Sequence, residues 1–152
     1  LNALTGAGVL VEDKLFATLD PTTRRFSLPD RQDVVLTDTV GFIRDLPHGL
    51  VKAFLATLEE VLEADLILIV IDAATEHAIE HKRVVEEVLK ELGAESRKKL
   101  LVLNKADLLC DEEKASLRDT FPEAVLVSAK LDQGTHDLID DIRKAIEPPI
   151  PQ

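Results

Sequence analysis

One uninterrupted apolar run, residues 66–71 (LILIVI), constrains the fold of this chain more than any other feature. The run has the length of a strand and contains no polar residue that would face water. Strands of this kind are buried on both faces, as in parallel sheets that helices cover. The run is far too short to cross a bilayer, so we expect no membrane span.

Segments with strand and helix patterns alternate along the rest of the chain. Strands are predicted over 24–28, 33–37, 99–103 and 124–127, and helices over 51–62, 79–92 and 134–146, with a short helix beginning at 111. A Pro29-Asp30 turn between the first two of these strands indicates a β-hairpin. Strands that alternate with helices predict an α/β fold with a mostly parallel sheet.

The composition restricts the possible partners and the compartment. A chain of 152 residues is long enough for one domain with a sizeable core. Its net charge of −11 argues against a bulk nucleic-acid-binding surface, because contacts to phosphates need Lys and Arg. This net charge does not argue against a local basic patch. The single cysteine, Cys110, excludes an internal disulfide and suits a reducing compartment, so we expect a cytoplasmic protein.

A short motif, Asp38-Thr39-Val40-Gly41, follows the predicted strand at 33–37. Many nucleotide hydrolases use an acid at the carboxyl end of a strand to hold magnesium, with a glycine three residues later near the terminal phosphate. The glycine permits a close approach of the backbone to a ligand. The pattern also occurs by chance, so the downstream motifs decide its meaning. A phosphatase with an aspartate nucleophile would need a second acid at position 40, and Val40 excludes it.

Asn104-Lys105-Ala106-Asp107 follows the predicted strand at 99–103, and each polar member has a chemical use at a guanine. A carboxylate at Asp107 can accept from both the ring N–H and the exocyclic amine of guanine, which adenine cannot match. The aliphatic stem of Lys105 can cover the purine face. Asn104 can tie neighbouring loops together and reach the base.

Ser128-Ala129-Lys130 follows the last predicted strand. It can supply a backbone N–H to the guanine carbonyl and a second covering stem from Lys130. Each motif alone has an ordinary structural explanation: Asp107 as a helix cap, Ser128 as a turn former and Lys130 as solvated surface. Three motifs in this order at strand ends favour a nucleotide site, because open α/β sheets bind ligands at that edge.

The order of these motifs resembles that in the translational GTPase-like P-loop proteins. More narrowly, the strings FATLDPTTRR and DTVGFIRDLPHGLVKAF are similar to those of the HflX family of ribosome-associated GTPases. The nucleotide-binding positions that the resemblance implies are Phe16, Ala17, Thr18, Leu19, Asp20, Asp38, Thr39, Val40, Gly41, Asn104, Lys105, Ala106, Asp107, Ser128, Ala129 and Lys130.

The resemblance also implies a fold, ligands and a partner. The fold would be a single G domain over 1–152, a three-layer α/β P-loop NTPase fold with a mostly parallel sheet and one antiparallel edge strand. Residues 1–8 would end its first helix, and 9–23 and 38–50 would be the two switch loops. GTP or GDP and Mg²⁺ would be the ligands, GTP hydrolysis the activity, and the large ribosomal subunit the partner.

Roles for three switch residues follow from the same resemblance. Thr18 would ligate Mg²⁺ through its hydroxyl when the γ-phosphate is present, and Asp38 would hold Mg²⁺ through a water molecule. The Gly41 N–H would face the γ-phosphate. Closing the two loops on the nucleotide is the ordering transition of GTPase switches.

Two departures from the general pattern affect the activity. No Gly-x-x-x-x-Gly-Lys-Ser/Thr motif is present, and the family places it just before the residues that match Leu1–Leu4. We therefore expect these residues alone to be inactive and prone to aggregation. Phe42 stands where Ras-like proteins carry a water-orienting glutamine, which implies slow intrinsic hydrolysis. The alternative function is a non-catalytic remnant or interaction module that keeps the fold without binding triphosphate.

Three other polar residues are not assigned to a ligand-binding role. His48 lies near the second switch loop and is interpreted as a solvated loop residue. Asp72, which ends the strand over 66–71, is interpreted as a backbone cap. Cys110 has no companion base and is interpreted as inert.

Overall fold

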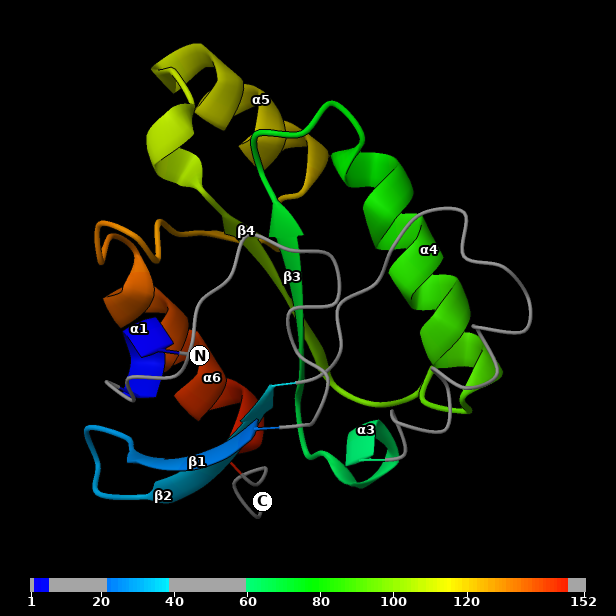
Figure 1. The fold of residues 1–152 in the computed structure, drawn as a ribbon, viewed down its shortest axis with the longest axis vertical. Coiled ribbons are helices and arrows are strands. Elements are labelled where there is room, and N and C mark those ends of the chain that lie inside the picture. The colour runs from blue at the N-terminus through cyan, green and yellow to red at the C-terminus, as the bar shows by residue number, and fades with distance from the viewer. Residues whose placement is uncertain (1, 6–21, 39–59, 148–152) are drawn as a thin grey trace, which may run out of the picture. The chain divides into compact units, whose positions relative to one another are not determined.

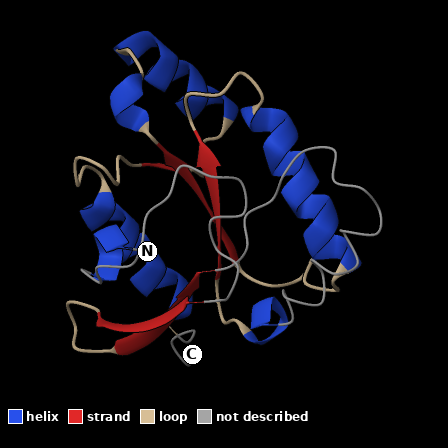
Figure 2. Ribbon diagram, in the orientation of Figure 1, coloured by secondary structure: helices blue, strands red, loops and turns tan. Residues whose placement is uncertain are grey.

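The structure is a computed structural model that describes residues 2–5, 22–38 and 60–147. The chain divides into two compact units, residues 1–64 with 84–95 and residues 65–83 with 96–152. The first unit contains a two-stranded antiparallel sheet, and the second contains a three-stranded parallel sheet (Figure 1, Figure 2). The predicted α/β class is confirmed, with its described strands in two separate sheets.

The first unit is built on a β-hairpin. Strands β1 (Thr22–Ser27) and β2 (Asp33–Asp38) pair antiparallel, with Ser27 opposite Asp33 next to the turn. Leu28 begins the turn and is buried, which anchors the hairpin by its apolar side chain. The predicted hairpin is confirmed, with bounds that differ by a residue or two.

Two short helices are also described in this unit, α1 (Asn2–Thr5) and α3 (Glu60–Glu63). The first lies within the stretch expected to end a helix, 1–8. The second coincides with the end of the helix predicted over 51–62, whose other residues lie outside the described ones.

The second unit contains the parallel strands in the order β3, β4, β5. These are β3 (Ile67–Asp72), β4 (Lys99–Asn104) and β5 (Val125–Leu126). The strands are separated in sequence by α4 (Ala78–Glu91), by the 3-10 helix η1 (Ala106–Leu108) with α5 (Asp111–Thr120), and are followed by α6 (Thr135–Ile146). The predicted alternation of strands and helices is confirmed, because helical segments lie between the consecutive parallel strands. Parallel strands require such crossover connections.

Strand β4 lies at the centre of the core of the second unit. Leu101, Val102 and Leu103 are at most 4% exposed. Helix α6 contributes Leu138 and Ile142, which are also buried and lie four positions apart, the spacing of one helix face.

Two details of the predicted strands are wrong. Strand β3 buries Ile69 and Ile71, but Val70 between them is 59% exposed, so the strand is not buried on both faces. Strand β5 is shorter than predicted at both ends. The Ala124 N–H donates to the Phe121 carbonyl at 3.0 Å, and the Val127 carbonyl accepts from the Ala106 N–H at 3.0 Å, although the Val127 N–H still donates to the Leu103 carbonyl of β4 at 2.9 Å.

The described helices are short relative to a bilayer. Within 2–5, 22–38 and 60–147, none is long and apolar enough to cross a membrane.

Candidate ligand-binding site at the strand ends

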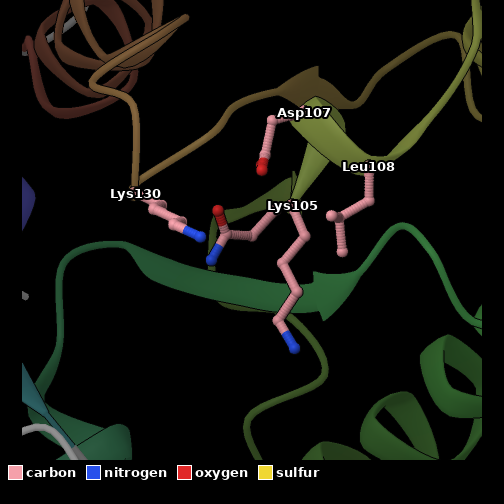
Figure 3. Close-up of a pocket in the computed structure, with 5 residues that line it drawn as sticks. Lys105, Asp107, Leu108 and Lys130 are labelled. Atoms are coloured by element: carbon pink, nitrogen blue, oxygen red, sulfur yellow. The ribbon is translucent and has the colours of Figure 1, made fainter.

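The carboxyl ends of β3 and β4 lie side by side, because Asp72 pairs in register with Asn104. A pocket of about 320 Å³ lies at the end of β4, and it is lined by Asn104, Lys105, Asp107, Leu108 and Lys130. Figure 3 shows Lys130 on one side of Lys105 and Leu108 on the other. Four of the five lining residues are site residues that the sequence predicted, and they come from the end of β4, from the segment with η1 that follows it, and from the turn after β5.

Asn104 joins these two loops. Its side-chain oxygen Oδ1 accepts a hydrogen bond of 3.0 Å from the Ala129 N–H, across 25 positions of the chain. Asn104 is the last residue of β4, so its backbone is fixed by the sheet. The bond sets the position of the 128–130 turn relative to β4. The Ala129 N–H, one of the backbone donors of the 128–130 motif that was expected to serve a ligand carbonyl, therefore already has an acceptor in this structure.

Ser128 holds the carboxylate of Asp107 in place. Its Oγ donates a hydrogen bond of 2.7 Å to Asp107 Oδ1 and accepts one of 3.2 Å from the Leu131 N–H. Ser128 is fully buried, and its backbone N–H and carbonyl both bond to Gln133. Ser128 is therefore a turn former and also the support of the carboxylate. An ionised carboxylate has about four lone-pair sites, so Asp107 keeps capacity to accept from a ligand.

Lys105 has an unusual backbone conformation. Its φ is 65° and its ψ is 31°, which lie in the left-handed region that residues other than glycine rarely adopt. This conformation turns the chain from β4 into η1, where the Leu108 N–H donates to the Lys105 carbonyl at 3.0 Å. The Lys105 Nζ donates to Asp72 Oδ2 at 2.9 Å. The strained turn and the ion pair together determine the direction of the lysine stem.

Asp72 was interpreted from the sequence as a backbone cap, and the structure shows that it has two partners. Its Oδ1 accepts from the Ala74 N–H at 2.9 Å, as a cap does, and its Oδ2 accepts from Lys105. The second contact follows from the pairing of two strands, whose register the sequence did not specify. Two neighbouring parallel strands end at 72 and 104, so the residues that follow one strand meet those that follow the other.

Leu108 lines the pocket but was not singled out from the sequence. It is 64% exposed, although it is a large apolar side chain. Its position directly after the Asp107 motif was the only available signal.

Several predicted site residues lie outside the described ones. Residues 16–20 and 39–41, which include Thr18 and Gly41, belong to this group. Asp38 is described as the last residue of β2, in the other unit from the pocket. Within the described ranges we find no group of three or more His, Cys, Asp or Glu side chains that could hold a metal ion.

The pocket combines a carboxylate held by a buried hydroxyl, an amide and two lysine stems. Such a set can accept hydrogen bonds from the donor edge of a planar heterocycle while the aliphatic stems cover its faces.

The sequence of this chain is similar to those of known GTPases. Residues 1–105 match the family model described as 50S ribosome-binding GTPase. The chain is 51% identical over 146 residues to the GTPase HflX of Caldanaerobacter subterraneus subsp. tengcongensis, over 96% of this chain and 33% of that protein. It is 44% identical over 153 residues to the GTPase HflX of Escherichia coli (strain K12), over 99% of this chain and 36% of that protein. The chain therefore spans about a third of the length of these relatives.

Solved structures with similar folds include two nucleotide complexes. The chain resembles SsGBP in its complex with GDP with a TM-score of 0.74 and 27% identity, over 94% of this chain and 44% of that chain. It resembles Era, in complex with MgGDPNP and nucleotides 1506–1542 of 16S ribosomal RNA, with a TM-score of 0.77 and 21% identity, over 99% of this chain and 53% of that chain. The second similarity concerns the fold alone.

Proposed function

Because the chain belongs to the family of 50S ribosome-binding GTPases and is HflX-like within it, we propose that it is the guanine-nucleotide-binding domain of a GTPase that acts on the large ribosomal subunit. The observation that supports this most directly is the joining of two motifs at one pocket. Ser128 bonds to Asp107, and Ala129 bonds to Asn104, so both loops form a single site.

In this proposal Asp107 selects guanine. Its carboxylate accepts from the ring N–H and the exocyclic amine of the base, while adenine presents no matching pair of donors. The stems of Lys105 and Lys130 cover the two faces of the base. Asn104 keeps the turn that carries Lys130 next to the end of β4.

The reaction is the hydrolysis of GTP to GDP and inorganic phosphate, with Mg²⁺ bound to the phosphates. Asp38 fits as a magnesium-holding residue, because it is a carboxylate at the carboxyl end of β2 and hard cations prefer oxygen donors. Thr18 is the second proposed magnesium ligand. When bound, Mg²⁺ neutralises negative charge on the phosphate oxygens. Phe42 has no group that could orient the attacking water, so intrinsic hydrolysis is expected to be slow.

The partner and compartment follow from the family. The description of the matching family names the 50S ribosome, so the large ribosomal subunit is the proposed partner and the cytoplasm the proposed location. The alternative function is a non-catalytic interaction module that keeps the fold without binding triphosphate.

A calorimetric titration separates the two functions. The full-length gene product that contains this chain is titrated with GDP and with ADP in the presence of Mg²⁺. A guanine site predicts micromolar or tighter binding of GDP and at least about a hundredfold weaker binding of ADP, because unmatched buried polar groups are costly. Equal affinities, or no binding of either nucleotide, would contradict the proposal and favour the interaction module.

A further inference from the structure

We propose that Asp72 is a positioning residue that holds the stem of Lys105 in the conformation that covers the nucleotide base. This inference rests on the proposed guanine site. Asp72 does not line the pocket; it acts through the lysine that does.

The Asp72 carboxylate is itself held in a fixed orientation. Asp72 is the last residue of β3, and the hydrogen bonding to β4 continues one residue further, where the Ala73 N–H donates to the Asn104 carbonyl at 2.8 Å. The Ala74 N–H donates to Asp72 Oδ1 at 2.9 Å. With one oxygen held by its own backbone turn, the other oxygen, Oδ2, is presented to Lys105 at a fixed place.

Lys105 is the residue that needs such an anchor. Its side chain is 55% exposed, and a lysine ammonium is carried on a flexible four-carbon stem. Its Nζ lies 2.9 Å from Asp72 Oδ2. A stem that is ordered before the ligand arrives loses less conformational entropy on binding, which raises the affinity.

The contact to Lys105 is separable from the capping role of Asp72. In Asp72→Asn the amide oxygen still accepts from the Ala74 N–H, while the amide nitrogen cannot accept from the lysine ammonium. Exposed ion pairs contribute little to folding stability. The structure therefore predicts an effect on nucleotide affinity and almost none on the melting temperature.

The test is a double-mutant cycle in the full-length gene product, with GDP as the titrated probe. The variants are Asp72→Asn, Lys105→Met and the double variant, and Met keeps an unbranched stem while removing the ammonium. We expect Asp72→Asn to weaken GDP binding about threefold to tenfold. In the Lys105→Met background the same substitution should change the affinity by less than twofold. Turnover at saturating GTP should stay within twofold while KM rises.

Two further variants complete the design. Glu123→Gln removes another exposed carboxylate that lies 3.9 Å from a lysine, Lys82, and should leave GDP affinity unchanged. Asp72→Glu keeps the charge, and we expect GDP affinity within threefold of wild type. This variant keeps the proposal testable if Asp72→Asn loses stability.

Four results would overturn the inference. GDP affinity of Asp72→Asn equal to wild type would show that the ion pair does not prepare the site. Tighter binding would show that Asp72 competes with the nucleotide for Lys105. An equal loss in the Lys105→Met background would show that Asp72 acts through its backbone turn. A wild-type protein that does not bind GDP would remove the proposed function together with this inference, whereas the first three results leave the guanine site standing.

Discussion

Ser128 Oγ and Asp107 Oδ1 are joined by a 2.7 Å hydrogen bond across 21 positions of the chain. The bond connects the turn after β5 to the 3-10 helix after β4, and Ser128 is fully buried. A carboxylate that a buried donor holds keeps one orientation before a ligand arrives. Its remaining acceptor capacity then meets the ligand without a further cost of ordering.

The first prediction concerns the choice of base. Asp107→Asn in the full-length gene product should weaken GDP binding by about tenfold to a hundredfold, because a hydrogen bond to a charged group contributes about 1.5–3 kcal/mol. The same variant should bind xanthosine diphosphate more tightly than wild type does, since xanthine has a carbonyl where guanine has an amine. Both affinities are measured by calorimetry.

A matched substitution controls for the loss of one charge. Asp119→Asn makes the same chemical change at an exposed position of α5 and should leave both affinities unchanged. Unaltered GDP affinity in Asp107→Asn would exclude Asp107 from base recognition.

The second prediction concerns the buried hydroxyl. Ser128→Ala removes the donor to Asp107 and leaves the Leu131 N–H without its acceptor. We expect a loss of about 1–3 kcal/mol in the free energy of unfolding, the usual cost of an unsatisfied buried group, together with weaker GDP binding. Denaturant titration measures the first quantity and calorimetry the second.

Thr135→Ala is the control for this prediction. Thr135 is buried in the same region, and its hydroxyl donates to Asp132 at 2.5 Å, away from the pocket. It should lower stability without changing GDP affinity. If both variants lowered the affinity equally, the loss would reflect general loosening of the loop rather than the support of Asp107.

Much of this arrangement could be predicted from the sequence, because its signals are local. The apolar run at 66–71 and the helical periodicity at 134–146 gave the types of β3 and α6, and the polar motifs directly after apolar strands gave the site. The burial of β3 was overestimated at Val70, because the same apolar run suits a strand with one covered face or two.

The Asp72–Lys105 pair could not be predicted, because it depends on the register between two strands. Ile67 pairs with Lys99 and Asp72 with Asn104, and no local pattern encodes this alignment. The left-handed backbone of Lys105 is also without a local signal, since such conformations are usually assigned to Gly or Asn. Lys105 keeps the left-handed conformation because of tertiary contacts: its Nζ bonds to Asp72, and the N–H of the next residue, Ala106, bonds to the Val127 carbonyl.

The third prediction concerns Gly134, the residue at the N-cap position of α6. A Cβ at Gly134, whose φ is 73°, would lie 2.3 Å from the Leu126 carbonyl oxygen. Gly134→Ala should therefore lower the free energy of unfolding by roughly 3 kcal/mol or more, because the main chain must shift in addition to the left-handed strain. Gly93→Ala has a similar φ of 78° with no atom within 4 Å of the new Cβ, and should cost only about 1–2 kcal/mol. Denaturant titration of the two variants tests the difference; equal losses would show that the loop yields to the methyl group.

The last prediction concerns Leu108, which lines the pocket although it is 64% exposed. A planar ligand that covers an exposed leucine removes apolar surface from water. This burial contributes about 25 cal/mol per Å² to the free energy of binding. Leu108→Ser should therefore weaken GDP binding about fivefold and leave the melting temperature nearly unchanged. Leu131→Ser makes the same change at a leucine that is 53% exposed and is not among the residues that line the pocket. Calorimetric titration of GDP compares the two variants. An equal effect of both, or none from Leu108→Ser, would show that the nucleotide does not reach this side of the pocket.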